Sequence, residues 1–468
     1  MNKAIEDIYP LTPTQQGMLF HSLQQPGSGV YVLQVSFVLS GDIHHETAQQ
    51  AWQDLALRHP VLRTAFVWEN QQQALQVVGK GVTIPYRVED WKNYCHSKQH
   101  KLFTQFVEHD RHNEFNLNKA PALRVQVFQL ADKHCQFLIS FHHLILDGWS
   151  LPLLVKEWLT LYLTAVNASL SSRLPALQPL PPFRDYCAWL LQHQQTNKEK
   201  ADNFWREQLR GINSKTPLKL LPASLVSDAS SEKIKEADNK STNHRQLKLS
   251  EETTRQLKQL AQQQRITLNT IFQAAWSIVL SKLSGEQDII YGTTRSGRPS
   301  VLPQAENRVG MFINTVPMRV KIDVNLSAID FIQQIQQQQI AQQEFELLSL
   351  NSIRHVSDFK ANDSLFDSII VFENYPMEEA LAPYADILAM SDVKIQEQTN
   401  YPLSWYITAK ETLEIKALFD EKKYDAQHIT TLLSAIQWLL ASIASNSQQQ
   451  AFALILIHID RFDLVTSS

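Results

Sequence analysis

Hydrophobic and polar positions follow a helical period in several stretches of this chain. Residues 45–60 are amphipathic, with Ala48, Trp52, Leu55 and Leu57 on or near one side. A stripe of this kind is typical of a helix that packs one face against another element. The spacing therefore predicts a helix that covers a sheet or a neighbouring helix.

Other stretches carry helix-start signals or alternate with a period of two. Residues 12–25 predict a helix that is opened by Thr12, with Pro13 at its first helical position. Strands are predicted between and after these helices, in residues 31–41, 122–131 and 135–143. Helices that cover a sheet place the chain in the α+β class.

A second series of helices and strands follows a polar interruption. Residues 225–246 are nearly free of large apolar side chains, so we interpret them as a linker or loop. Ser250 then opens a predicted helix, with Glu251 and Glu252 in its first turn. Gln336–Gln339 lies in an otherwise helical pattern, and we interpret it as a solvated face. The remaining predicted elements are a helix pair in 183–209, a second helix ending near 285, and strands within 287–299 and 314–322.

Composition narrows the function classes. A chain of 468 residues is too long for one ordinary domain, so we expect two large lobes. The 43 basic and 47 acidic residues give a formal charge of −4 and form no long block of one sign, which argues against a nucleic-acid surface. Glycine is scarce, with 12 residues, and no GxGxxG or GxxxxGK[ST] pattern occurs, which argues against a phosphate-binding nucleotide site.

Cysteine usage and the chain start indicate a compartment. Cys95, Cys135 and Cys187 stand far apart and have neither the spacing of a zinc site nor the even number of a disulfide framework. Residues 1–13 contain no apolar core of a signal peptide, and no apolar run approaches the ~18 residues of a membrane span. These features predict a soluble, cytoplasmic protein.

Candidate chemistry concentrates in residues 138–154, where His142 and His143 end an apolar run. Adjacent side chains of a strand point to opposite faces, so both rings and Asp147 converge on a metal only if the strand breaks. A buried structural pair is the second interpretation. The third is a histidine base, because Asp147 and Gly148 form a turn signal where a scaffold presents side chains, and a histidine pKa of about 6.5 suits proton transfer.

The segment HHLILDG, residues 142–148, matches the HHxxxDG signature of the condensation domains of nonribosomal peptide synthetases. These domains are similar in fold and motif to chloramphenicol acetyltransferase. Further stretches resemble the family's other motifs in the same order, so the chain is identified as a member of this family. They are YPLTPTQQGMLFHS (9–22), RHPVLRTAF (58–66), YCAWL (186–190), YGTTRSGRP (291–299), VGMFINTVPMRV (309–320) and DSIIVFENYP (367–376).

The resemblance implies a fold and a boundary. The expected fold is α+β, with two acetyltransferase-like α/β sandwich lobes in a V-shaped pseudodimer and the histidine motif at their junction. The boundary is expected near Pro175, which gives an N-terminal lobe of residues 1–175 and a C-terminal lobe of residues 176–468.

The resemblance also implies an acyltransferase that forms peptide bonds in antibiotic biosynthesis and related secondary metabolism. An acceptor aminoacyl amine on one carrier protein attacks the donor peptidyl thioester on another. Both substrates arrive as 4'-phosphopantetheine thioesters, and no cofactor is expected to be bound permanently. The implied partners are upstream and downstream carrier proteins and adjacent synthetase domains, with no nucleic acid and no membrane.

Carried over residue by residue, the resemblance gives each motif residue a role. His143 is the catalytic candidate, either as a base or as a group that orients the amine and stabilises the tetrahedral intermediate, and both roles stay open. Gly148 keeps the turn tight, and its amide is a candidate donor to the developing oxyanion. The expected structural residues are His142 and Asp147, the latter ion-paired with Arg298 or, as the alternative, with Arg63.

Differences at the motif distinguish related domains. Heterocyclisation domains carry aspartates in place of the histidines, and inactive recruiting domains usually lose the second one, whereas His143 is present here. Trp149 precedes Ser150, the reverse of the order in epimerisation domains. The segments that resemble the subtype taking a donor that ends in a D-residue are residues 9–22, 147–154 and 369–376.

Further positions are candidates for the substrate channel. Asn314 lies beside an apolar run and is placed either to bond a substrate backbone or to cap a bend. Glu373 and Asn374 follow a predicted strand and border the expected acceptor channel, and Trp149 and Ser150 adjoin the catalytic turn. Two other functions stay open: a carrier-docking or recruitment module that makes no bond, and a free-standing amide synthase that uses a soluble amine.

Overall fold

The computed structural model describes residues 4–219, 244–360, 363–373 and 377–446, which divide into two compact units. Unit 1 contains residues 1–196, 296–313 and 375–400, and unit 2 contains residues 197–295, 314–374 and 401–468. This division differs from the single boundary expected near Pro175. The N-terminal part extends through Thr196, and two later segments return to it because they supply a sheet strand and the partners of Asp147.

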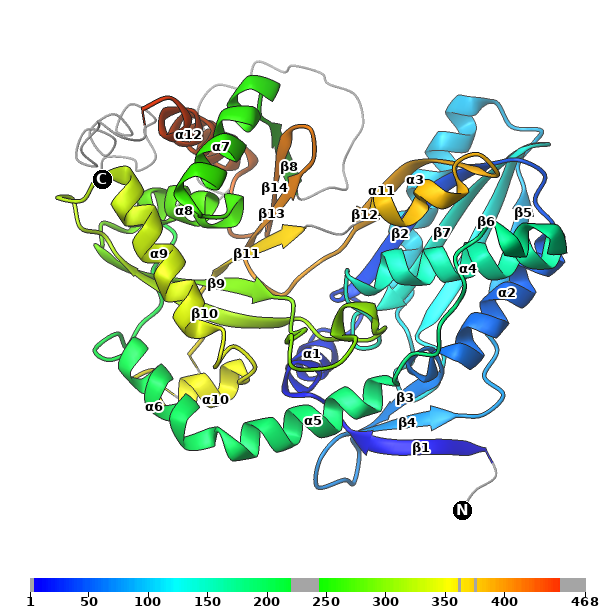
Figure 1. The fold of residues 1–468 in the computed structure, drawn as a ribbon, viewed down its shortest axis with the longest axis horizontal. Coiled ribbons are helices and arrows are strands. Elements are labelled where there is room, and N and C mark those ends of the chain that lie inside the picture. The colour runs from blue at the N-terminus through cyan, green and yellow to red at the C-terminus, as the bar shows by residue number, and fades with distance from the viewer. Residues whose placement is uncertain (1–3, 220–243, 361–362, 374–376, 447–468) are drawn as a thin grey trace. The chain divides into compact units, whose positions relative to one another are not determined.

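In the described part of unit 1, the central sheet has five strands in the order β12-β2-β7-β6-β5 (Figure 1). Neighbouring strands are antiparallel except for β5 and β6, which are parallel. Strands β2 and β7 pair along their full length, so that Val32 lies opposite His142. The strands are β2 (Val32–Ser40), β5 (Tyr86–Asp90), β6 (Leu123–Ala131), β7 (His134–His142) and β12 (Ala389–Gln396).

Alternation along β7 explains how helices cover this sheet. The ring of Phe137 lies 5.6 Å from that of Trp158 in α4, and Trp158 stacks on Trp52 of α2 at the same distance. The next residue, Leu138, faces the opposite side and packs with Val107 of α3. The period of two predicted for residues 135–143 is therefore confirmed. The helices are α2 (His45–Arg58), α3 (His96–His112) and α4 (Ser150–Val166).

Two details expected of the helices have different outcomes. Helix α1 (Pro13–Gln24) begins after Thr12, whose Oγ1 accepts a hydrogen bond from the Gln15 amide while Gln15 Oε1 accepts one from the Thr12 amide, which confirms the predicted start. Leu57 of α2 is 65% exposed, so its expected place on the buried side is wrong. It lies about 200° around the helix from Leu55, which is buried.

Further elements of unit 1 lie outside its central sheet. A three-stranded antiparallel sheet has the order β1-β4-β3, and helix α5 begins with the buried Phe183. These elements are β1 (Ile5–Pro10), β3 (Thr64–Val67), β4 (Leu75–Gly79) and α5 (Phe183–Thr196).

Unit 2 contains a six-stranded sheet among its described residues, in the order β10-β9-β11-β13-β14-β8. Strand β11 runs parallel to both of its neighbours, and the other pairs are antiparallel. The predicted strands within 287–299 and 314–322 are confirmed as β9 and β10. The strands are β8 (His244–Lys248), β9 (Asp288–Arg295), β10 (Asn314–Lys321), β11 (Ser368–Glu373), β13 (Leu403–Ala409) and β14 (Leu413–Phe419).

Helices cover both faces of this sheet as well. On one face, Trp276 of α8 contacts Trp405 of β13 with ring centroids 5.0 Å apart. On the other face, Ile290 of β9 packs with Trp205 of α6 and Ile353 of α10. The helices are α6 (Lys198–Gln208), α7 (Glu251–Gln264), α8 (Leu268–Ser284), α9 (Ala328–Gln342), α10 (Leu350–His355) and α12 (Ala426–Asn446).

Helix α12 is long and apolar enough, over residues 426–445, to match the length and composition of a membrane span, which we did not expect from the sequence. Ile429, Leu432, Ile436 and Leu439 of this helix are buried in the hydrophobic cluster of unit 2. A core helix fulfils the same criteria, and this packing identifies α12 as one.

Two polar stretches differ from their interpretation. Gln339 is buried and donates to Gln273 Oε1 at 3.1 Å, so the solvated-face interpretation of 336–339 is wrong at this position. Most of the expected linker, 225–246, lies outside the described residues, but its last three residues belong to β8 and not to a loop.

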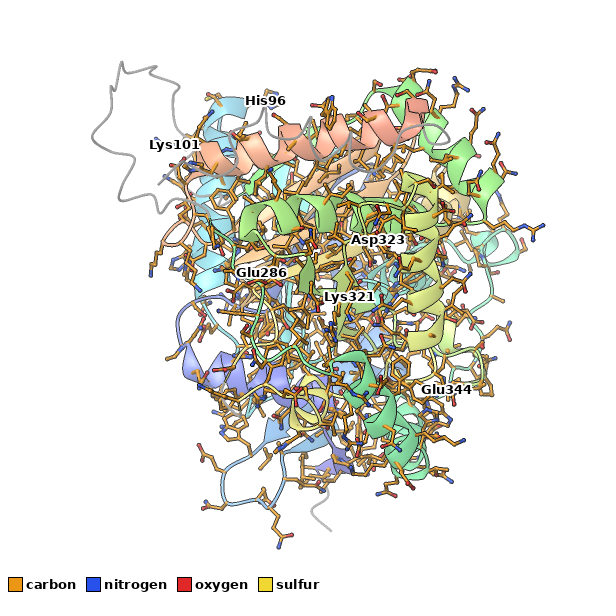
Figure 2. The ribbon with its side chains drawn as sticks, turned by 90° about the vertical axis from the view of Figure 1, so that its left-hand side faces the viewer. His96, Lys101, Glu286, Lys321, Asp323 and Glu344 are labelled. Carbon is orange, nitrogen blue, oxygen red and sulfur yellow. The ribbon has the colours of Figure 1, made fainter. Side chains whose placement is uncertain are left out.

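Exposed charged side chains occur on both units, for example Lys101 on α3 in unit 1 and Glu344 after α9 in unit 2 (Figure 2).

Candidate active site at the end of strand β7

The histidine motif lies in unit 1, where β7 ends. His142 is the last residue of the strand, and the His143 amide donates to the carbonyl of Tyr31 at 2.9 Å. A turn follows at once, in which the Ile145 amide donates to the His142 carbonyl at 3.1 Å. The chain therefore leaves the sheet between the two histidines, and their rings enter different surroundings.

His142 is a neutral, packed residue. Its Nδ1 accepts a hydrogen bond from the Leu144 amide at 3.1 Å, so the proton is on Nε2, which donates to Ser22 Oγ at 3.1 Å. Burial, with a smaller contribution from the charge of the neighbouring His143, lowers the pKa of His142 to about 3. No lone pair of His142 is left for a substrate.

His143 has a different set of partners. Its Nδ1 lies 3.0 Å from the Leu146 carbonyl oxygen, and its Nε2 lies 2.9 Å from Glu397 Oε2. Burial alone would lower the pKa of His143. The hydrogen bond and charge of Glu397, with smaller contributions from the Leu146 carbonyl and Asp147, outweigh burial and hold this pKa above its usual value.

Asp147 is fully buried and anchors the turn. Its carboxylate accepts two hydrogen bonds from Arg298, from Nη1 at 2.6 Å and from Nη2 at 3.0 Å. It also accepts the amides of Ser150 and Phe312, each at 3.0 Å. The preferred partner of Asp147 is thus the one observed. Arg63, the alternative, binds Glu6 and the Gly79 carbonyl instead.

Segment 296–313 completes this network. The guanidinium of Arg298 lies over the ring of Phe312, with its carbon 4.3 Å from the centroid. Ser150 Oγ lies 2.8 Å from Asp147 Oδ1 and 2.9 Å from the Gly310 carbonyl, and it accepts the Gly310 amide at 3.0 Å. Ser150 is fully buried in these bonds, so its expected place in a substrate channel is wrong.

Glu397 is the functional candidate that the sequence did not reveal. It directly follows β12, whose last residue, Gln396, pairs with Gln34 of β2. The next residue, Gln398, accepts the Tyr31 amide at 3.0 Å through its carbonyl. Tyr31 Oη also donates to Asn400 Oδ1 at 2.8 Å, so one tyrosine holds both the backbone of His143 and the segment after Glu397.

The other expected channel residues have mixed outcomes. Trp149 is half-buried at the start of α4, beside the catalytic turn. Asn314 belongs to unit 2, where its side-chain amide donates to the carbonyls of Glu346 and Leu348. Glu373 ends β11 in unit 2 and accepts Thr408 Oγ1 at 3.1 Å, and Asn374 lies outside the described residues.

No group of three or more His, Cys, Asp or Glu side chains suited to hold a metal ion occurs among the described residues. The carboxylate nearest to His142 and His143 in sequence, Asp147, is occupied by Arg298 and by backbone amides. For chemistry, the arrangement provides the imidazole of His143, which is fixed through Nδ1 and directs Nε2 toward the carboxylate of Glu397.

Sequence comparisons show which known proteins this chain is similar to. A family model described as a condensation domain matches residues 5–458. The linear gramicidin synthase of Brevibacillus parabrevis has a component that is 37% identical over 454 residues, which are 97% of this chain and 9% of that protein. Tyrocidine synthase 2 of Brevibacillus parabrevis is 31% identical over 447 residues, 95% of this chain and 12% of that protein. The chain thus spans a small part of these relatives.

Solved structures share the fold. The first condensation domain of the calcium-dependent antibiotic synthetase has a TM-score of 0.75 at 14% identity and covers 96% of this chain and 99% of its own. The X-domain from teicoplanin biosynthesis has a TM-score of 0.74 at 18% identity and covers 94% and 96%. The expected mixed α/β fold of condensation domains is therefore confirmed.

Proposed function

The chain belongs to the condensation-domain family of nonribosomal peptide synthetases, whose members form amide bonds by acyl transfer, and from this premise we propose that it joins a donor peptidyl thioester to an acceptor aminoacyl amine. The observation that carries the proposal is the setting of His143. Its ring is fixed by the Leu146 carbonyl, and the turn behind it is held by the buried pair of Asp147 and Arg298.

The proposed reaction is a direct acyl transfer. The acceptor nitrogen attacks the thioester carbonyl carbon, the C–N bond forms, and the C–S bond breaks as the tetrahedral intermediate collapses. The nitrogen loses a proton, and the departing sulfur gains one. His143 Nε2 is the atom proposed to hold the amine in place and to exchange this proton, and each role contributes large rate factors in enzymes.

Gly148 and Asp147 serve the same step in different ways. The carbonyl oxygen of the thioester gains negative charge as the amine adds, and we assign the Gly148 amide as its donor. Asp147 does not transfer protons in this proposal, because Arg298 and backbone amides occupy both of its oxygens. It keeps the turn from His143 to Gly148 in one shape.

The substrates are proposed to ride on phosphopantetheine arms of an upstream and a downstream carrier protein, within or beside a larger synthetase. The donor is proposed to end in a D-residue, which is supported by the resemblance of residues 9–22, 147–154 and 369–376 to that subtype. A cytoplasmic location is proposed as well, because Cys95, Cys135 and Cys187 are free thiols.

The test is a carrier-to-carrier assay that is read by intact-protein mass spectrometry. The donor carrier holds a dipeptide that ends in a D- or an L-residue, and the acceptor carrier holds glycine. Wild type should transfer the D-ending dipeptide faster, and His143→Ala should lower the rate by roughly 10²–10⁴. His134→Ala is the matched control, because His134 lies on the same strand and is exposed.

Other outcomes lead to other functions. Transfer to free glycine as fast as to the loaded carrier would indicate an amide synthase that uses a soluble amine. Carrier binding without transfer from either donor would indicate a docking module. The likeness to the X-domain from teicoplanin biosynthesis, at 18% identity, concerns the fold only and favours none of these cases.

A further inference from the structure

The partners of His143 limit what its ring can do at rest. A carbonyl oxygen only accepts, so Nδ1, at 3.0 Å from the Leu146 oxygen, must carry a proton. A carboxylate also accepts, so a proton lies between Nε2 and Glu397 Oε2, which are 2.9 Å apart. With both nitrogens engaged as donors, His143 has no lone pair with which to receive an amine.

Glu397 Oε2 occupies the hydrogen-bonding position on His143 Nε2 that the proposed function assigns to the acceptor amine. Its side chain is 13% exposed and that of His143 is 8% exposed, so little water surrounds the pair. Asp147, the other carboxylate that acts on His143, is taken up by Arg298 and by the amides of Ser150 and Phe312. His142 faces Ser22 and is neutral.

The backbone fixes Glu397 from both sides. Before it, Gln396 pairs with Gln34 in the sheet, and its Oε1 accepts Arg111 Nη2 at 2.6 Å. After it, the Gln398 carbonyl accepts the amide of Tyr31, the residue whose own carbonyl accepts the His143 amide. The backbone on either side of Glu397 is therefore fixed, and Tyr31 holds both this segment and the backbone of His143. This shared contact keeps the carboxylate and the imidazole close to each other.

We propose that Glu397 and His143 work as one proton-holding pair, in which Glu397 binds the acceptor as its ammonium ion and the pair removes the proton that makes it a nucleophile. This inference rests on the proposed function, because it concerns the acceptor of that reaction. An α-amino group has a pKa of about 8 and therefore arrives mostly protonated near neutral pH.

Protons balance over the cycle. At rest the pair holds one shared proton between Nε2 and the carboxylate. Entry of the ammonium places a second cation beside Glu397, so the shared proton leaves to solvent and His143 Nε2 becomes a free base. The ammonium then gives one proton back to the pair, which restores the resting form beside a neutral amine. That amine then attacks the thioester. The pair gives its proton to the departing sulfur and takes the second proton from the nitrogen of the tetrahedral intermediate, which returns the pair to its resting form.

The experiment compares two acceptors on the same carrier protein. Glycine arrives as an ammonium ion, whereas aminooxyacetate carries a weakly basic nitrogen that is already neutral at pH 7 and needs no proton removed before attack. The donor is the dipeptidyl carrier that wild type transfers fastest, and the variant is Glu397→Gln, which keeps shape and removes charge. The control is Glu69→Gln, an exposed glutamate in the loop after β3.

Glu397→Gln should lower transfer to glycyl carrier about 10²-fold and leave transfer to aminooxyacetyl carrier within about threefold of wild type. Retained transfer to the second acceptor also shows that the variant is folded. An equal loss with both acceptors, which a purely structural Glu397 would produce, overturns the inference and leaves the proposed function standing, as does no loss with either. If wild type transfers to neither acceptor, the proposed function fails, and the inference fails with it.

Discussion

Two arginine–aspartate pairs in this molecule have nearly the same geometry and different surroundings. Asp147–Arg298 in unit 1 and Asp288–Arg319 in unit 2 are both held by two hydrogen bonds, with a shortest N–O distance of 2.6 Å. The Asp147 side chain is 0% exposed and that of Arg298 is 5% exposed, whereas Asp288 is 41% exposed. Both side chains of the first pair are buried, whereas the aspartate of the second pair is exposed to solvent.

Burial changes what such a pair does. Water can solvate Asp288 if its partner is lost, so the pair contributes little, as exposed ion pairs usually do. Asp147 has no water to replace Arg298, and it also accepts the amides of Ser150 and Phe312. Loss of one partner there leaves an uncompensated charge and unpaired amides. The two pairs therefore have the same shortest N–O distance but are expected to contribute differently to stability.

The largest expected effect is that of Asp147→Ala. It leaves the guanidinium of Arg298 buried without its counter-ion, so we expect a loss of roughly 3–5 kcal/mol in the free energy of unfolding. Transfer activity should fall with it, because the turn that carries His143 loses its anchor. Urea denaturation and the carrier-to-carrier assay measure the two losses.

An Asp147→Ala protein that denatures at the wild-type urea concentration would remove the contrast between the two pairs. It would mean that water reaches Arg298 in solution. Loss of activity without loss of stability would instead make Asp147 a residue of the chemistry and not of the turn.

The strand and the helix next to the histidine motif in unit 1 could be predicted, because the sequence patterns that indicate them span only a few neighbouring residues. The alternation of residues 135–143 predicted β7, and the capping pattern at Thr12 predicted α1. The pairing of Asp147 with Arg298 spans 151 residues, and it came from the family motif and not from any physical signal in the chain. The division into compact units differs from the single boundary that the resemblance implied, because segments 296–313 and 375–400 belong to unit 1.

Glu397 shows what the sequence could not supply. It lies 254 residues after His143, in a polar stretch without a marked period, and it follows a strand whose side chains are mostly exposed. Only the pairing of β12 with β2 brings it to the histidine. Gln339 was missed for a related reason, since a polar residue becomes a core residue only when a distant partner such as Gln273 satisfies it.

Ser150→Ala tests whether the network behind Asp147 matters beyond the ion pair. The change removes the hydroxyl that accepts the buried Gly310 amide and contacts Asp147, so we expect a loss of about 1–3 kcal/mol. Ser434→Ala is the control, because Ser434 is exposed on α12 and its hydroxyl donates to the Thr430 carbonyl of the same helix. Equal urea midpoints for the two variants would show that Arg298 alone accounts for the stability of the turn.

Titration gives the unit 1 turn a pH dependence of known sign. The pKa of folded His142 is about 3, below its unfolded value of about 6.5, so protons favour unfolding and stability should fall as pH drops below 6.5. The slope is at most ~1.4 kcal/mol per pH unit. His143 has the opposite effect, because its pKa is higher in the folded protein than in the unfolded chain. Its contribution to the free energy of unfolding is fully present below pH 6.5 and is lost as the pH rises through the pKa of folded His143.

Urea denaturation at pH 7, 6 and 5 separates the two histidines. His142→Asn should flatten the dependence below pH 6.5, because asparagine cannot be protonated, whereas His134→Asn on the exposed start of β7 should not. A His142→Asn protein with the wild-type slope would mean that His142 is not held neutral by burial.

The smallest expected effect is that of Asp288→Ala, which sets the other end of the comparison. Arg319 keeps the carbonyls of Gln208 and Arg210 as acceptors, and water reaches the vacated side, so the loss should be about 1 kcal/mol or less. It should shrink further in 1 M NaCl, where the screening length is about 3 Å, while the loss from Asp147→Ala should hardly change. A salt-independent loss of several kcal/mol in Asp288→Ala would show that an exposed carboxylate can matter as much as a buried one when its arginine partner is itself largely buried.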